Sequence, residues 1–130
     1  MDYKKGILSG IVAGIVLLVL GFIMSMIYPA YSEWYMKVFA EMDMTWMWIA
    51  TMLTGIFMGL IYAVINKSIP GKDCKKGFNY GVLVWLLAGV MWPIMAIGYA
   101  PIMITIYDLF SGFVMYGLAG VALSKVYAKF

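Results

Sequence analysis

The stretch that decides the fold is residues 6–28, which read GILSGIVAGIVLLVLGFIMSMIY. No charged side chain interrupts it. A helix needs about 20 mainly apolar residues to cross a hydrocarbon core roughly 30 Å thick, so this stretch is long enough to span a membrane. It is longer than the roughly 7–15 apolar residues of a secretory signal and lacks a convincing small-x-small cleavage site. We therefore expect it to be retained as a transmembrane helix.

Three similar runs follow at residues 44–65, 77–99 and 101–124, and only Asp108 places a charge inside them. Hydrophobic residues make up 65% of the chain and charged residues 12%. A soluble domain averages about 25% charged residues, so this composition disfavours a water-soluble fold. The sequence predicts an all-α membrane protein in which residues 1–130 form a single domain of four transmembrane helices.

The two halves of the chain resemble each other when Lys4 is laid on Lys75, an offset of 71 residues (75 − 4). Identical pairs at this offset include Lys4/Lys75, Lys5/Lys76, Gly6/Gly77, Gly10/Gly81, Ile23/Ile94, Met24/Met95 and Tyr28/Tyr99. The second helices align at Gly55/Gly112 (112 − 55 = 57) and, after a one-residue slip, at Gly59/Gly117 and Lys67/Lys125 (117 − 59 = 58). Self-similarity of this kind indicates an internal repeat.

Each repeat corresponds to one helical hairpin. We predict repeat 1 over residues 4–67, a cytoplasmic loop over residues 68–74 and repeat 2 over residues 75–125. Because each hairpin contains two crossings, both hairpins enter the membrane from the same side. The pseudo-twofold axis that relates them should therefore run along the membrane normal.

The lysines predict the orientation, because cytoplasmic flanks of membrane helices accumulate Lys and Arg. All nine basic residues are lysines, and only Lys37 lies in the connection between the first two runs. The others flank the opposite ends of the spans: Lys4, Lys5, Lys67, Lys72, Lys75, Lys76, Lys125 and Lys129. We predict a multi-pass protein of the plasma membrane with both termini in the cytoplasm and an amphipathic outer connection over residues 29–43.

Glycines recur at close to helical spacing in all four runs. The candidate helix-packing residues are Gly6, Gly10, Gly14, Gly55, Gly59, Gly77, Gly81, Gly112 and Gly117. Lipid supplies no hydrophobic force between helices, so small residues that permit close backbone approach are the usual contact points. These glycines either pack the four helices of one protomer or, for the long series in the first helix, form a homodimer interface.

Three residues form a candidate solute or ion site. Asp108 is the one carboxylate inside a span, where an ionisable group indicates function by default. Counting about 20 residues back from Lys125 puts the outer boundary near Thr105, so Asp108 is alternatively an interfacial residue that caps or pairs with Lys37. Pro93, beside Trp92, removes a backbone donor and should kink the third helix, either to open a cavity or for packing alone.

Six tyrosines lie in or beside the spans: Tyr28, Tyr62, Tyr80, Tyr99, Tyr107 and Tyr116. Because most lie near span ends, we predict that they anchor the protein at the membrane interfaces. Hydrogen bonding across helices is the alternative.

The chain has no histidine and a single cysteine, Cys74. These absences remove the commonest zinc and haem ligands, the commonest general base and any paired-thiol chemistry. We predict no catalytic residue, no cofactor and no metal site, and hence no enzyme.

The 13 methionines leave one metal hypothesis open, because thioethers are soft ligands that suit Cu(I). The methionines in question are Met42, Met44 and Met47 in the outer segment and the pair Met91 and Met95. Methionine also fills irregular apolar gaps without binding any metal.

One pattern resembles a group of known proteins. It consists of Gly77, Gly81, Trp85, Leu86, Pro93 and Gly98, followed by Gly112, Tyr116 and Gly117. The chain resembles the small four-helix membrane proteins of bacteria and archaea that have no assigned function, over nearly its whole length. The resemblance implies a fold and no activity.

The almost uncharged spans and the many glycines favour a non-catalytic helix-packing scaffold, either homo-oligomeric or an accessory subunit of a larger membrane complex. The alternative is a small oligomeric transporter or channel for a neutral or weakly polar solute, and the third hypothesis is a Cu(I)-binding membrane protein. The expected partners are the lipid bilayer and a membrane protein or second copy. Nucleic acid is not expected, because the lysines lie in short flanks and not in a basic stripe.

Overall fold

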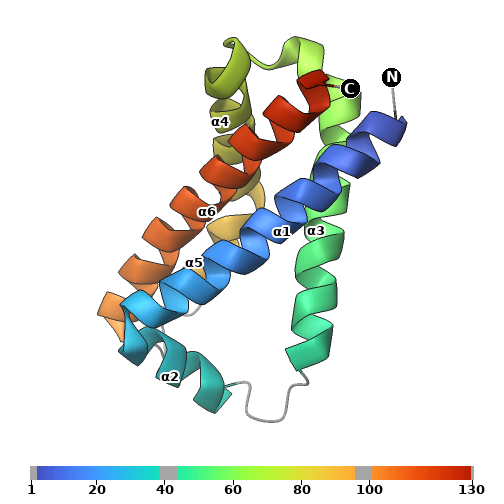
Figure 1. Ribbon diagram of the computed structural model, residues 1–130. Coiled ribbons are helices and arrows are strands. Elements are labelled where there is room, and N and C mark those ends of the chain that lie inside the picture. The colour runs from blue at the N-terminus through green and yellow to red at the C-terminus, as the bar shows by residue number, and fades with distance from the viewer. Residues whose placement is uncertain (1–2, 39–43, 96–100, 130) are drawn as a thin grey trace.

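The structure is a computed structural model that describes residues 3–38, 44–95 and 101–129. Within these residues, four helices are long and apolar enough to cross a membrane: Tyr3–Ile27, Thr45–Ser68, Cys74–Met95 and Ile102–Lys129. The prediction of an all-α, multi-pass membrane protein with four spans is confirmed. Figure 1 shows both chain ends at one end of the bundle, here called the terminal end, and the short helix α2 at the other, here called the α2 end.

The spans are built from named elements along the chain. They are α1 (Tyr3–Ile27), α2 (Pro29–Val38), α3 (Met44–Ile65), the 3-10 turn η1 (Asn66–Ser68), α4 (Asp73–Val84), the π-helical turn η2 (Trp85–Gly89), α5 (Met91–Met95) and α6 (Ile102–Lys129). The first, second and fourth spans are essentially continuous helices. The third span, from α4 to α5, changes its helical geometry midway.

Prolines and a glycine set the ends of several elements. Pro29 begins α2, where its fixed φ suits the first helical position and its missing N–H is not needed. The connection between η1 and α4 turns at Gly71, whose φ of 102° is favourable only for glycine. Asn79 Nδ2 donates to the Pro70 carbonyl at 2.8 Å, and Ile69 is buried against the core. This connection is therefore a compact turn.

The helices lie in an open row in the order α3, α1, α6, α4. Helix α1 packs against α3 on one side and α6 on the other, and α6 packs against α4 (Figure 1). No comparable helix contact joins α3 to α4 within the described residues. Two side chains bridge this pair near the terminal end, where Tyr80 of α4 donates to the Met58 carbonyl of α3 at 2.5 Å and its ring packs on Tyr62.

Many small residues are buried, and most bulky apolar residues lie on the outside. Ala13 and Ala119 are completely buried, while Leu87 is 84% exposed. A water-soluble protein sorts its residues the other way, because there burial of large side chains drives folding. Here lipid solvates the large side chains, and small residues let the backbones approach.

Candidate functional site at the broken third span

The closest approach between α1 and α3 runs along glycines. A Cβ added at Gly6 would stand 2.8 Å from the Gly59 carbonyl oxygen and 3.1 Å from the Ala63 Cβ. A Cβ at Gly10 would stand 2.7 Å from the Gly55 carbonyl oxygen, and one at Gly14 would meet Met52. The two backbones therefore touch at a separation that no larger residue allows.

The pair α4 and α6 meets in the same way. A Cβ at Gly77 would stand 2.5 Å from the Gly120 carbonyl oxygen, and one at Gly81 would stand 2.8 Å from the Gly117 Cα. At Gly117 the missing side chain makes room for the Phe78 ring, at 2.9 Å from the added Cβ. Gly120 and Ser124 of α6 are thus the residues that face Gly77.

Glycine has a different role beside Trp85. A Cβ at Gly89 would stand 2.6 Å from Trp85 Cδ1, and one at Gly112 would stand 3.2 Å from the same atom. The indole thus packs against both glycines, and its Nε1 donates to the Leu109 carbonyl of α6 at 3.2 Å. The broken part of the third span is therefore held against α6 by a hydrogen bond and by close packing.

The third span departs from α-helical geometry at η2. Val90 N donates to the Trp85 carbonyl at 3.1 Å, five residues back, and α-helical spacing resumes where Ile94 N donates to the Val90 carbonyl at 3.3 Å. Pro93, which is buried, has no N–H for the Gly89 carbonyl four residues before it. The sequence predicts a kink at Pro93, and the structure widens the helix from Trp85 to Gly89, just before that residue. Such π-helical turns occur frequently at functional sites.

Asp108 lies half-buried on α6. It follows the first residue of α6 by six positions (108 − 102), or about 9 Å of helix. Helix α6 has 28 residues and is therefore about 42 Å long. When α6 is centred on a hydrocarbon core about 30 Å thick, each of its ends extends roughly 6 Å beyond the core. Asp108 is then about 3 Å inside the core.

The structure brings Pro93 and Asp108 onto two elements that contact each other, α5 and α6. Trp92 completes the predicted set, but its side chain lies outside the part of the chain that the structure describes. Sequence reasoning used Thr105 only as a boundary marker. Thr105 is in fact buried at 3% exposure, and its hydroxyl has no hydrogen-bond partner.

The prediction that the tyrosines anchor the protein at the interfaces is wrong for Tyr62 and Tyr80, which are 4% and 1% exposed. The two rings pack at 5.1 Å, and Tyr127 of α6 packs on Tyr62 at 5.1 Å. Lys5 of α1 places its Nζ 5.5 Å from the centre of the Tyr127 ring. These residues join all four spans at the terminal end, and the alternative of hydrogen bonding across helices holds for Tyr80, whose hydroxyl donates to the Met58 carbonyl.

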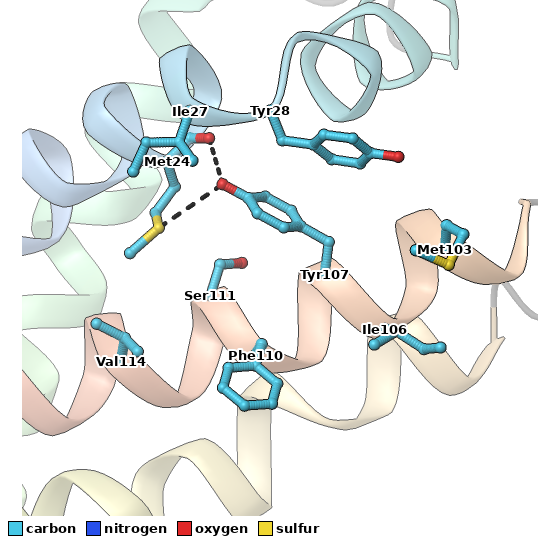
Figure 2. A pocket seen from close by; sticks show the side chains of 9 residues that line it. All are labelled: Met24, Ile27, Tyr28, Met103, Ile106, Tyr107, Phe110, Ser111 and Val114. Carbon is cyan, nitrogen blue, oxygen red and sulfur yellow. Dashed lines mark hydrogen bonds between the residues drawn. The ribbon is translucent and has the colours of Figure 1, made fainter.

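A second cross-helix tyrosine lies toward the α2 end. Tyr107 of α6 donates to the Met24 carbonyl of α1 at 2.5 Å, with the Met24 sulfur at 3.8 Å (Figure 2). Its ring packs on Tyr28 at 4.9 Å. Tyr99 lies outside the described residues.

An open groove of about 400 Å³ adjoins this contact, between the last turns of α1 and the first half of α6 (Figure 2). Its lining is almost entirely apolar and includes Phe110 and Met103. Of the three hydroxyls that line it, that of Tyr107 donates to the Met24 carbonyl and that of Ser111 donates to the Asp108 carbonyl at 3.1 Å; the third belongs to Tyr28. The groove therefore presents an apolar surface.

Metal-binding chemistry has little support in this part of the molecule. Within the described residues, no three His, Cys, Asp or Glu side chains gather as metal ligands would. Of the predicted methionines, Met47 and Met95 are exposed, Met42 lies outside the described residues, and the side chains of Met44 and Met91 are not described. The Cu(I) hypothesis gains no arrangement of methionines from the structure.

No family model matches the chain, and no curated protein or solved structure matches it.

Proposed function

We propose that the protein is a non-catalytic membrane module that associates with a further transmembrane helix, from a second copy or from a larger membrane complex. The observation that carries this proposal is the open row of spans. Within the described residues, α3 and α4 each pack along one side against a neighbouring span, and the contact that joins them is that of Tyr80 with the Met58 carbonyl and the Tyr62 ring, near the terminal end. A closed four-helix bundle would pair them along their length.

Exposed apolar residues on these two spans support the proposal. Phe57 of α3 is 56% exposed, and Leu86 and Leu87 of η2 are 56% and 84% exposed. The glycines that could have mediated association are already in contact within the protomer, in the pairs α1 with α3 and α4 with α6. We therefore propose that a partner docks on the bulky flank of α3 and not on the glycine series of α1.

Photo-crosslinking in native membranes tests this assignment. A benzophenone amino acid at Phe57 is expected to capture a membrane protein, either a second copy or another subunit, which the mass of the adduct identifies. Val19 of α1 is the matched control, because it is 52% exposed within a span but lies on a different helix. Equal capture at both positions, or a monodisperse monomer with no adduct at Phe57, would contradict the proposal.

We also propose that the terminal end faces the cytoplasm and that the membrane is the plasma membrane. Eight of the nine lysines support this orientation, because they lie beside the span ends that gather there. Lys37 lies on α2, at the opposite end.

The orientation predicts how Cys74 reacts. Cys74 is a free, exposed thiol at the terminal end, so a membrane-impermeant maleimide should label it in permeabilised cells and not in intact ones. Lys37→Cys in a Cys74→Ser background should show the reverse pattern. Labelling of Cys74 from outside intact cells would invert the topology.

The tandem hairpin repeat belongs to the same proposal. The contacts that support it recur with fixed offsets. Gly6 contacts Gly59 and Ala63, and Gly77 contacts Gly120 and Ser124. The first helix of each hairpin is therefore offset by 71 residues (77 − 6). The second helix is offset by 61 residues (120 − 59 and 124 − 63). This register differs by about one turn from the Gly59/Gly117 alignment of the sequences (117 − 59 = 58).

The pseudo-twofold along the membrane normal has weaker support. A twofold that exchanges the hairpins would make the contact of α1 with α6 equivalent to one of α4 with α3. The contact of α1 with α6 is extensive, whereas α4 meets α3 through Tyr80, whose hydroxyl donates to the Met58 carbonyl near the terminal end. We therefore propose that the repeat governs packing within each hairpin, while the packing between hairpins follows the twofold only loosely.

A small transporter or channel is the second candidate function, and the broken third span favours it. Discontinuous helices near polar side chains are how many transporters build their sites. Reconstitution in liposomes with a panel of ions and small neutral solutes tests this candidate. A protein that conducts none of them leaves the association module standing.

A further inference from the structure

The lysines of the terminal end gather at one level of the molecule. Gly6 of α1 packs on Ala63 of α3, and Gly77 of α4 packs on Ser124 of α6. The contact of the Lys5 ammonium with an aromatic ring of α6 ties the two pairs together. Eight lysines lie within five residues of one of these four contact residues, the largest separations being 77 − 72 and 129 − 124. We call them the lysine belt: Lys4, Lys5, Lys67, Lys72, Lys75, Lys76, Lys125 and Lys129.

The lysine belt carries a large net positive charge. Six of its eight lysines are exposed, and the other two are half-buried. The sequence places two acidic residues, Asp2 and Asp73, beside them, which leaves a balance of +6 (8 − 2). The connection over residues 29–43 has one lysine and three acidic residues, a balance of −2 (1 − 3). The positive charge is therefore concentrated at the terminal end.

The part of the belt richest in lysine is the compact turn between α3 and α4, which has four lysines in residues 67–76. Within it, the Lys75 N–H donates to the Lys72 carbonyl at 3.2 Å, and Asn79 Nδ2 donates to the Pro70 carbonyl at 2.8 Å. Because the backbone is held in this way, mainly the lysine side chains would have to be ordered when a ligand binds, which lowers the entropic cost of binding. The turn therefore presents its ammonium groups from a fixed backbone.

Exposed apolar side chains continue from the belt toward the middle of the spans. On α3, Val64 and Ile61 are exposed about one and two turns before Lys67. On α4, Phe78 and Leu83 are exposed beyond the lysines of the turn. The surface thus combines cationic groups at the end of the spans with apolar side chains next to them. This combination matches an amphiphile that has an anionic head and hydrocarbon tails.

We propose that the lysine belt binds the headgroups of anionic phospholipids in the leaflet at the terminal end, with the turn over residues 67–76 as its main contact. Clusters of about four to eight basic residues beside a membrane span attract anionic lipids. The attraction acts within about a Debye length, roughly 10 Å at 0.1 M salt. A phospholipid fits better than a soluble anion, because its acyl chains also cover the exposed apolar side chains next to the belt. The proposal does not depend on the association function, because an isolated protomer carries the whole belt.

The test is native mass spectrometry of the purified protein in nonionic detergent, titrated with phosphatidylglycerol or with phosphatidylcholine of the same acyl chains. The wild type should bind phosphatidylglycerol more tightly by at least about tenfold. The double variant Lys72→Gln with Lys75→Gln should weaken phosphatidylglycerol binding by about 10- to 30-fold, since each lysine near a membrane surface contributes roughly fivefold. Its binding of phosphatidylcholine should stay unchanged.

Lys37→Gln is the matched control, because it removes one charge from an exposed lysine of α2, at the opposite end, as Lys75→Gln removes one from the belt. Lys75→Gln should weaken phosphatidylglycerol binding about fivefold, and Lys75→Arg and Lys37→Gln should leave it near wild type. Equal wild-type affinities for the two lipids overturn the proposal, as do equal losses in Lys75→Gln and Lys37→Gln. Soluble glycerol phosphate that competes as well as phosphatidylglycerol would overturn the assignment to lipid.

Discussion

Gly10→Ala is expected to destabilise the folded protein by about 1–3 kcal/mol, the range for overpacking a tight contact. The added Cβ would stand 2.7 Å from both the Gly55 carbonyl oxygen and the Ile56 Cα, and backbone atoms cannot move aside as a flexible side chain can. Helices α1 and α3 would have to separate. Alanine's better intrinsic helix propensity, about 1 kcal/mol, offsets only part of this cost.

Gly21→Ala is the control on the same helix. Its Cβ would find only the Met115 Cε at 3.7 Å, which is ordinary van der Waals contact, so stability should stay the same or rise slightly. The free energy of unfolding in a mixed-micelle SDS titration measures both variants. If both lost stability equally, close backbone approach would not be what joins α1 to α3.

Tyr80→Ala is expected to cost about 3–5 kcal/mol, the range for truncating a buried aromatic side chain. Tyr80 is 1% exposed, packs on Tyr62 and is the side chain that ties α4 to α3. Tyr80→Phe keeps the ring and removes only the bond to the Met58 carbonyl. Its cost should be about 0.6–1.7 kcal/mol, as measured for hydrogen bonds between membrane helices.

Leu83→Ala, one turn further along α4, provides the comparison. Leu83 is 45% exposed on the outer surface, so truncation there should change stability by less than about 1 kcal/mol. The same unfolding titration ranks the three variants. A Tyr80→Ala protein as stable as Leu83→Ala would mean that the α3–α4 bridge contributes nothing to the fold.

The candidate site was only partly predictable from the sequence. Asp108 and Pro93 stand out by chemistry, as a charge and an imino acid within apolar runs. Thr105 does not, because a threonine in a membrane helix normally bonds to its own backbone, and only the folded structure shows that this one does not. The widened turn at Trp85 was likewise hidden, since the Trp85 indole there packs not only on Gly89 of its own turn but also on Gly112 of α6, which is distant in the sequence.

The tyrosines illustrate the same limit. Their positions near the span ends suit interface anchors, and nothing in the local sequence separates Tyr80, which is buried, from Tyr3, which is exposed. The glycine contacts are a related case. Sequence identity pairs Gly59 with Gly117, whereas the glycine of α6 that packs on Gly77, as Gly59 packs on Gly6, is Gly120; two positions one turn apart on a helix share a face.

The number and type of the spans follow from the sequence alone. In hydrocarbon every backbone polar group must be satisfied within its own segment, so four apolar runs of sufficient length become four helices whatever surrounds them. The order of the row, the side each helix presents to α1 and the break at η2 come only from the tertiary structure. Lipid is as apolar as leucine, so hydrophobicity carries no information about inside and outside here, and fit between surfaces decides.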